Sequence, residues 1–160
     1  KRQHYGSMFR RAVEEEIIVP EKTIQIGIRK HYHRGELEFL GRHGIERITS
    51  KELKAIEAMG SGLRESLGAR LARLQGSPVY VTFDLDFVDA ASAPGIGSPE
   101  PFGPTSFEAV EALRALAGIA SRIVAMDLVE LSPPHDVANL TAYLAAQILF
   151  EMVCLLPPRR

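Results

Sequence analysis

Two aspartates that follow a short apolar run are the residues of this sequence best suited to chemistry. Asp84 and Asp86 are two positions apart after the run Val79–Phe83, so on an extended chain both carboxylates project from the same face. Burying two like charges together costs on the order of several kcal/mol per ion, and a divalent cation offsets that cost. Carboxylate oxygens suit Mg²⁺ or Mn²⁺. The pair therefore predicts a metal site, the alternative being that the strand has already ended and both acids are solvated.

Two further acids lie where they could support such a site. Asp89 either caps the following loop or holds a ligand in place, and its position favours loop capping. Glu130 ends a second apolar run, and its carboxylate should open onto the same side of the sheet as the aspartates, where it could receive a cationic group. On spacing alone, an exposed loop acid is an equal interpretation of Glu130.

The histidines show no ligand spacing among themselves. Taken by itself, His4 is an ordinary residue near the start of the sequence. The remaining histidines are predicted to be surface residues: His31, His33, His43 and His135.

The elements that must position these residues follow from the spacing of apolar side chains. Helical spacing is found over Met8–Ile17, from Ser50 to Gly60, and over Leu63–Leu74, Phe107–Ala117 and Leu140–Leu156. Strand patterns are found over Thr23–Arg29, Ile45–Ile48, Val79–Phe83 and Arg122–Glu130, whereas Ala90–Pro104 is predicted to be a long loop. Alternating strands and helices predict a three-layer α/β fold around a mainly parallel sheet, with the 79–83 strand covered on both faces.

The bulk composition limits the partners. The 160 residues are 46% hydrophobic with a net charge of −1, which fits one domain with a real core and gives no broad field for nucleic acid or an anionic membrane. No apolar run reaches the roughly 18 residues of a membrane span. The single Cys154 lies in an apolar segment and is predicted to pack in the core of a protein from a reducing compartment. We therefore expect a cytoplasmic protein with a small-molecule partner.

Longer motifs resemble the ureohydrolase family, which includes arginases and agmatinases. The segment from Phe83 to Asp89, followed by Ala93 to Glu100, is similar to that family's third signature. The segment Asp127–Asp136 resembles its last block, and Gln25–Arg29 resembles its middle strand. The Ala-Pro-Gly, Ser-Pro-Glu and Ser-Pro-Pro forms are similar to the agmatinase branch.

The resemblance implies an arginase-like three-layer α/β/α fold and a specific chemistry. Asp84 and Asp86 would be ligands of a binuclear Mn²⁺ centre, although other divalent metals are compatible, and Glu130 would bind the guanidinium of a small cationic substrate as both a binding and a catalytic residue. His4, in the segment His4–Phe9, would be the catalytic histidine. A hydroxide bridging the metals would release urea from an amine. The resemblance also implies a homo-oligomer, a trimer or hexamer.

Two family motifs are missing, a Gly-Gly-Asp-His type and an Asp-Ala-His-x-Asp type, both upstream of His4 in family order. We therefore expect residues 1–160 to be the C-terminal portion of a single ureohydrolase-like domain, inactive alone, which also fits the unusual first residue Lys1. The alternative is a catalytically incomplete relative that serves as a binding or oligomerisation module. A phosphotransfer receiver-like domain is disfavoured, because the acidic pair lies past the middle of the chain.

Three further residues depart from the family pattern in the long loop. They are Ala90 in place of Pro, Ile96 in place of Thr and Phe102 in place of Gly. They predict a guanidino substrate other than agmatine.

Overall fold

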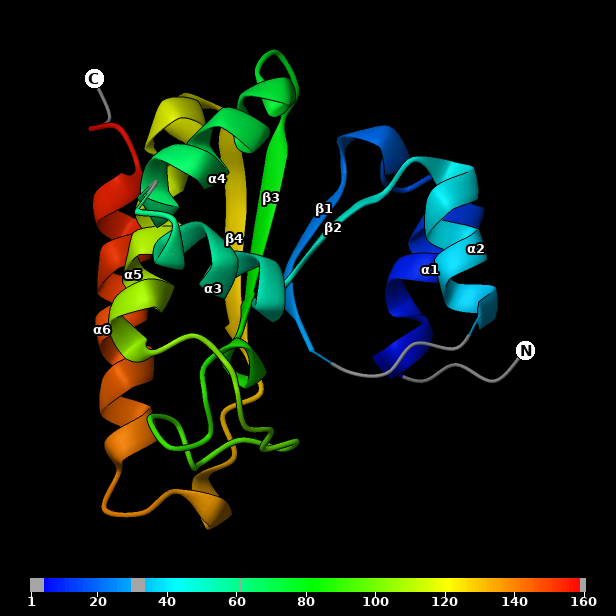
Figure 1. Ribbon diagram of the computed structural model, residues 1–160. Helices are drawn as coiled ribbons and strands as arrows, with labels where there is room; N and C mark the ends of the chain where they lie inside the picture. Colours follow the sequence, from blue (N-terminus) through cyan, green and yellow to red (C-terminus); the bar gives the residue numbers. More distant parts are fainter. Residues whose placement is uncertain (1–4, 30–33, 61, 159–160) are drawn as a thin grey trace.

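The computed structural model describes residues 5–29, 34–60 and 62–158, arranged as helices on two sides of short parallel strands (Figure 1). One side carries the helices α3 (Ser50–Ala58), α4 (Leu63–Leu71), α5 (Ser106–Arg114) and α6 (Leu140–Leu155). The other side carries α1 (Met8–Glu14) and α2 (Arg34–His43). Between them lie β1 (Ile24–Ile28), β2 (Glu46–Thr49), β3 (Val79–Asp84) and β4 (Ile123–Val129). The predicted three-layer α/β/α arrangement is confirmed.

The strands pair in parallel, two by two. Ile26 of β1 lies opposite Ile48 of β2, and Phe83 of β3 lies opposite Leu128 of β4. Parallel neighbours need a crossover, which α2 supplies for β1 and β2, and α5 with a 3₁₀ segment (Ala115–Arg122) supplies for β3 and β4. Within the described residues these pairs form two separate sheets, where the sequence predicted one.

The main core lies between the strands and α3–α6. The predicted leucine stripe of α4 faces it, with Leu67 fully buried and Leu63 and Leu71 nearly so. Ile148 of α6 and Phe83 of β3 pack into the same cluster. A second, smaller cluster joins α1 to α2, with the buried residues Val13, Leu40 and Ile45.

Two threonines begin helices on the core side. The Thr49 side chain accepts a hydrogen bond from the Glu52 amide, and the Glu52 side chain accepts one from the Thr49 amide. Thr105 and Glu108 repeat this capping box at the start of α5. Each box satisfies amides that a helix start leaves without partners, and fixes the residue at which the chain turns into the helix.

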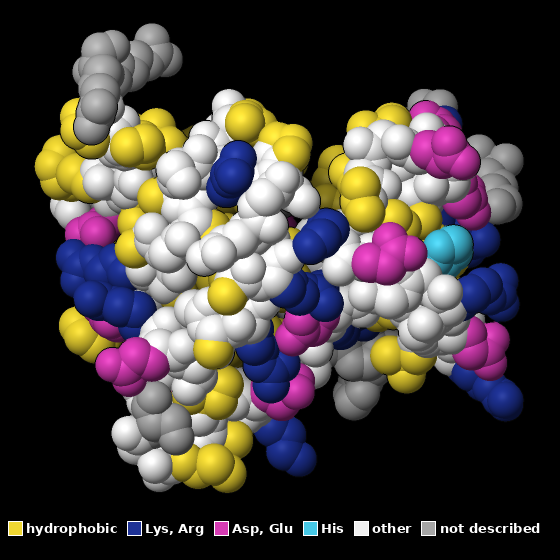
Figure 2. Space-filling model, turned by 90° about the horizontal axis from the view of Figure 1, so that it is seen from above, with side chains coloured by type: hydrophobic (Ala, Val, Ile, Leu, Met, Phe, Trp, Pro, Cys, Tyr) yellow, Lys and Arg dark blue, Asp and Glu magenta, His cyan; other side chains and the backbone are white. Residues whose placement is uncertain are grey.

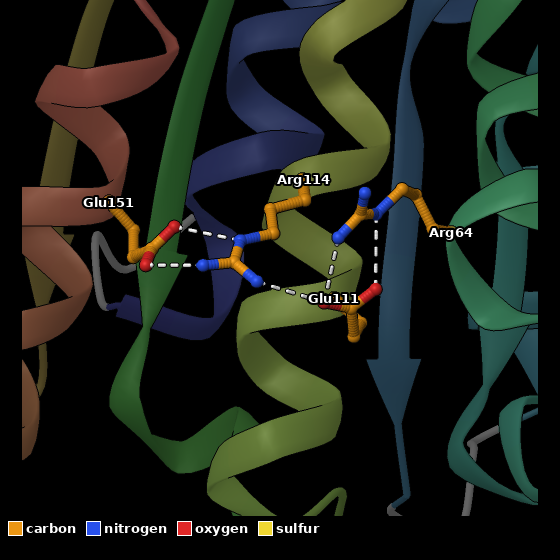
Figure 3. A network of polar contacts seen from close by, with 4 residues as sticks. All are labelled: Arg64, Glu111, Arg114 and Glu151. Carbon is orange, nitrogen blue, oxygen red and sulfur yellow. Dashed lines mark hydrogen bonds and ion pairs between the residues drawn. The ribbon is translucent and has the colours of Figure 1, made fainter.

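Charged side chains link the outer faces of α4, α5 and α6 (Figure 3). Glu111 accepts from Arg64 at 2.9 and 3.0 Å and from Arg114 at 3.2 Å. Arg114 in turn donates two hydrogen bonds to Glu151, at 2.7 and 2.9 Å. Positive and negative side chains also intermix over much of the face in Figure 2, which agrees with the balanced net charge.

Three expectations about the elements were wrong. The segment that forms α2 was not predicted as a helix, because its two glycines, Gly35 and Gly41, hide a weak apolar stripe whose buried member is Leu40. Tyr80 of β3 is 55% exposed, so among the described residues the face of β3 that it shares with Thr82 is only partly covered. Cys154 is exposed on α6 and does not pack in the core.

No helix in the part of the chain that the structure describes has both the length and the apolarity required to cross a bilayer.

Candidate metal and substrate site

Asp84 and Asp86 meet through a tight turn at the end of β3. Asp84 is the last residue of that strand, and Asp86 lies in the 3₁₀ turn Leu85–Phe87 that follows. The Asp84 carboxylate accepts a hydrogen bond of 2.8 Å from the Asp86 amide. The pair predicted from strand alternation is therefore brought together by a turn, because the strand ends at Asp84, two residues before Asp86.

The surroundings of Asp84 disfavour its negative charge. Burial, followed by the negative charges of Asp86 and Glu130, raises the pKa of Asp84 to about 6, against the hydrogen bond from the Asp86 amide and the positive charge of Arg29. The residue as a whole stays exposed, so the carboxylate remains accessible to a ligand. The charges of Asp86 and Glu130 thus both act on Asp84 at this end of the sheet.

Asp89 closes the long loop on itself. Its carboxylate accepts from the Ala91 amide at 2.9 Å and from the Gly103 amide at 2.8 Å, and its own amide donates to the Pro104 carbonyl at 2.8 Å. The first of these bonds is the largest effect that lowers the pKa of Asp89. The prediction that Asp89 caps the loop is confirmed.

The middle of the loop docks on the connection between β4 and α6. The Gly95 amide donates to the buried Thr141 hydroxyl at 2.7 Å, and the Gly95 carbonyl accepts from the Ser132 amide at 2.8 Å. Ile96 forms an isolated antiparallel bridge with Leu131. These contacts fix the loop beside the residues that follow β4.

The docked loop brings Glu130 toward the aspartates. A Cβ placed on Gly97 would lie 2.9 Å from Oε2 of Glu130, so only glycine leaves that carboxylate its position. One residue later, the Ser98 amide approaches Oδ1 of Asp86 at 3.4 Å. Glu130 itself is exposed and has a φ of 67°, an uncommon value for a side chain of its kind. The structure therefore places Glu130 on the same side as Asp84 and Asp86, as predicted.

Two residues of β1 and its end were not predicted as part of the site. Gly27 lies close to the 85–87 turn, and a Cβ there would overlap the ring of Phe87. Arg29 donates from Nη1 to the Phe87 carbonyl at 2.6 Å and from Nη2 to the Asp86 carbonyl. The available signal was a basic residue at the carboxyl end of a strand, where ligand sites of parallel sheets collect.

The histidines contribute little to the described site. His4, the residue that resemblance makes catalytic, lies outside the described residues, as do His31 and His33. His135 is exposed and bonds Ser132, and His43 packs on Phe39 at a ring separation of 4.4 Å. Within the described ranges no group of three or more His, Cys, Asp or Glu side chains is arranged to hold a metal.

Comparison with known proteins gives this geometry a context. The sequence profile described as "Arginase family" matches residues 1–154. The chain is 37% identical over 156 residues to the guanidinobutyrase of Pseudomonas aeruginosa, covering 96% of this chain and 46% of that protein. It is 36% identical to the mitochondrial agmatinase of Gallus gallus, covering 96% of this chain and 42% of that protein.

A solved structure agrees with the sequence relatives. The proclavaminate amidino hydrolase of Streptomyces clavuligerus superposes with a TM-score of 0.82 at 33% identity, covering 95% of this chain and 48% of that one. This chain spans about half the length of the relatives it matches. With a family match over nearly every residue, the chain belongs to the arginase family.

Proposed function

We propose that the chain serves the metal-dependent hydrolysis of a small guanidino compound to urea and an amine, in an agmatinase-like or guanidino-acid hydrolase. The observation that carries the proposal is the convergence of Asp84, Asp86 and Glu130 at the carboxyl ends of β3 and β4. The names of the relatives support a guanidino substrate. Assembly as a trimer or hexamer and a cytoplasmic location stay predictions.

The aspartate pair fits a divalent cation as part of its ligand shell. Oxygen ligands suit Mn²⁺, which takes about six of them, and two carboxylates supply a share of that number. A cation would also relieve the repulsion and burial that raise the pKa of Asp84 to about 6. By resemblance, further ligands belong to the two motifs that this sequence lacks.

Each residue then has one task. Asp84 and Asp86 would hold the metal, and a bound divalent cation supplies a water ligand of lowered pKa as nucleophile. Glu130 would hold the substrate guanidinium by a charge-assisted and bidentate pair, with its carboxylate directed past Gly97. His4 would carry the proton to the departing amine, a role that rests on resemblance alone.

The long loop that contains Ile96 and Phe102 would contact the part of the substrate farthest from its guanidinium, and would thereby select among guanidino compounds. Of the three departures from the family pattern, Ile96 is buried at 2% exposure and packs toward Leu131. Phe102 is 83% exposed and has a φ of 66°, so its ring is open to a ligand. We infer that Phe102 contributes more than Ile96 to the choice among guanidino compounds.

The first test measures bound metal by elemental analysis and urea release from agmatine and from 4-guanidinobutyrate. Both are measured for the 160-residue chain and for any longer polypeptide encoded by the same gene. Asp84→Ala should lose bound metal and urea release together, because it removes a ligand. Unchanged turnover in that variant would exclude Asp84 from the site.

Glu130→Gln separates substrate binding from metal binding. It should lower kcat/KM about 100-fold, the value of roughly 3 kcal/mol for a charge-assisted pair, with metal content unchanged. Glu38→Gln on α2 is the matched control, since Glu38 pairs only with Arg34 on its own helix among the described residues, and it should change neither quantity. If no form of the protein bound metal, the alternative of a catalytically incomplete binding or oligomerisation module would replace this proposal.

A further inference from the structure

Arg29 joins the end of β1 to the turn that carries the aspartate pair. Its guanidinium donates to the carbonyls of two consecutive residues, Asp86 and Phe87, across 57 and 58 positions of sequence. A planar guanidinium presents its donors as a rigid fork, which suits two neighbouring acceptors held at a fixed spacing. The single ammonium group of lysine does not reproduce that geometry.

The same guanidinium also borders the far end of the loop. A Cβ on Gly103 would lie 2.6 Å from Nη1 of Arg29 and 2.6 Å from the amide of Asp89. Arg29 therefore lies between the 85–87 turn and the closing end of the 89–103 loop. Its Nε is buried and has no hydrogen-bond partner among the described residues.

Asp86 is thereby held at three points, two on its main chain and one on its side chain. Its amide bonds the Asp84 carboxylate at 2.8 Å, its carbonyl accepts from Arg29, and its own carboxylate receives the Ser98 amide at 3.4 Å. Fixing the peptide on both sides of a residue restricts the directions in which its side chain can point. Arg29 thus donates from its side chain to the carbonyls of both Asp86 and Phe87.

We propose that Arg29 is a positioning residue for the aspartate pair: by clamping the carbonyls of Asp86 and Phe87 it sets the direction of the Asp86 carboxylate toward a divalent cation. This inference rests on the proposed function for its metal, but the clamp itself does not. Arg29 touches neither metal nor substrate in this role.

The experiment compares Arg29→Met, Arg29→Lys and a matched control, Arg70→Met, whose arginine pairs with Glu46 away from the loop. The first readout is amide hydrogen exchange without metal, and the second is Mn²⁺ affinity from the electron paramagnetic resonance of free Mn²⁺. We expect Arg29→Met to speed exchange at the Asp86 and Gly103 amides at least tenfold and to weaken Mn²⁺ binding at least tenfold. Exchange at the capping amide of Glu52 should stay unchanged.

Arg29→Lys keeps the positive charge and loses the fork, so it should speed exchange at the same amides by a smaller factor. It also keeps the test open if Arg29→Met does not fold. Exchange and Mn²⁺ affinity within twofold of wild type in Arg29→Lys and Arg29→Met would overturn the inference, as would equal effects in Arg70→Met. If neither the wild-type chain nor any longer polypeptide encoded by the same gene bound Mn²⁺, the proposed metal site would be overturned instead, and the exchange rates alone would then decide whether Arg29 holds the turn.

Discussion

At the scale of single residues, Gly27 is the position where β1 packs tightly against the 85–87 turn. It has a φ of 82°, and a Cβ would overlap the ring of Phe87. Gly27→Ala should therefore lower the free energy of unfolding by roughly 2 to 4 kcal/mol, from backbone strain and overpacking together. Urea denaturation measures this change.

Gly41→Ala is the control for Gly27→Ala. Gly41 lies within α2, and a Cβ added there would have nothing within 4 Å, so the change should stabilise the chain by about 0.5 to 1 kcal/mol. Adding Phe87→Leu to Gly27→Ala should restore the part of the free energy of unfolding that is lost to the overlap with the Phe87 ring. The part lost to backbone strain at position 27 should remain. Equal effects of the two glycine substitutions would show that β1 does not approach the turn this closely.

Side-chain type and position predicted part of the site. Asp84, Asp86 and Glu130 could be chosen from sequence because each follows an apolar run that ends at the ligand-binding edge of a parallel sheet. The position of Arg29 at the end of β1 could have marked it as a candidate, but its partners could not be predicted. They are main-chain carbonyls, and no pattern of side chains indicates where a distant carbonyl will point.

At the scale of elements, α3 and α5 are joined by an ion pair, and the raised pKa of a second acid of α3, Glu57, depends on the same Glu108 carboxylate. Lys54 bonds both carboxylate oxygens of Glu108, at 2.5 and 2.6 Å. A hydrogen bond with Glu108, followed by burial and by the charge of Glu108, raises the pKa of Glu57 to about 6. Although burial opposes it, bonding from Glu57, Lys54 and Thr105 lowers the pKa of Glu108 to about 2. Below about pH 6 these pKa values leave one proton shared between the two carboxyl groups, held mainly by Glu57.

This pair predicts a specific loss of stability with rising pH. Because the pKa of Glu57 is higher in the folded chain than its ordinary value of 4.5, its contribution is complete below pH 4.5 and is lost as pH rises through about 6. Glu57→Gln keeps a hydrogen-bond donor that does not titrate. As pH rises from about 4.5 to 6, the thermal midpoint of this variant should therefore increase relative to that of wild type. Asp84 titrates in the same pH range in both proteins. Its effect therefore cancels when the thermal midpoint of wild type is subtracted from that of Glu57→Gln at each pH, and this difference curve reports Glu57 alone.

Glu57→Ala completes the comparison between α3 and α5. It removes the hydrogen-bond donor at every pH, so it should be less stable than Glu57→Gln at pH 4.5. Like Glu57→Gln, it should lack the loss of stability that wild type shows between pH 4.5 and 6. A difference curve between Glu57→Gln and wild type that is flat from pH 4.5 to 6 would contradict the shared proton.

Most elements could be predicted because local signals agreed with the packing. The capping threonines, the stripe of α4 and the apolar β3 and β4 runs all pointed to the structure that forms. The helix α2 was missed because its weak stripe relies on Val13 and Ile45, which come from other segments, for its burial. The pairing of the strands into two separate sheets could not be predicted either, because strand pairing depends on neighbouring elements that the pattern of a single strand does not specify.

At the scale of the whole molecule, apolar surface is distributed unevenly. The inner residues of α6, such as Ile148 and Met152, are buried, yet Tyr143, Phe150 and Val153 on its outer side are 75%, 62% and 63% exposed. Figure 2 shows hydrophobic side chains at the upper left of the view, next to a group of charged side chains. Such contiguous surface binds apolar dyes and promotes association.

Phe150→Lys should therefore reduce the fluorescence of bound anilinonaphthalene sulfonate and the tendency to associate, both of which follow exposed apolar area. Because the Phe150 side chain is already in solvent, the free energy of unfolding should stay within about 0.5 kcal/mol of wild type. Ile148→Lys, two residues away and fully buried, is the matched control and should unfold the chain, since it forces a charge into the core. If Phe150→Lys were as damaging as Ile148→Lys, the outer side of α6 would be buried in solution, and light scattering before and after the substitution would show whether a second copy of the chain covers it.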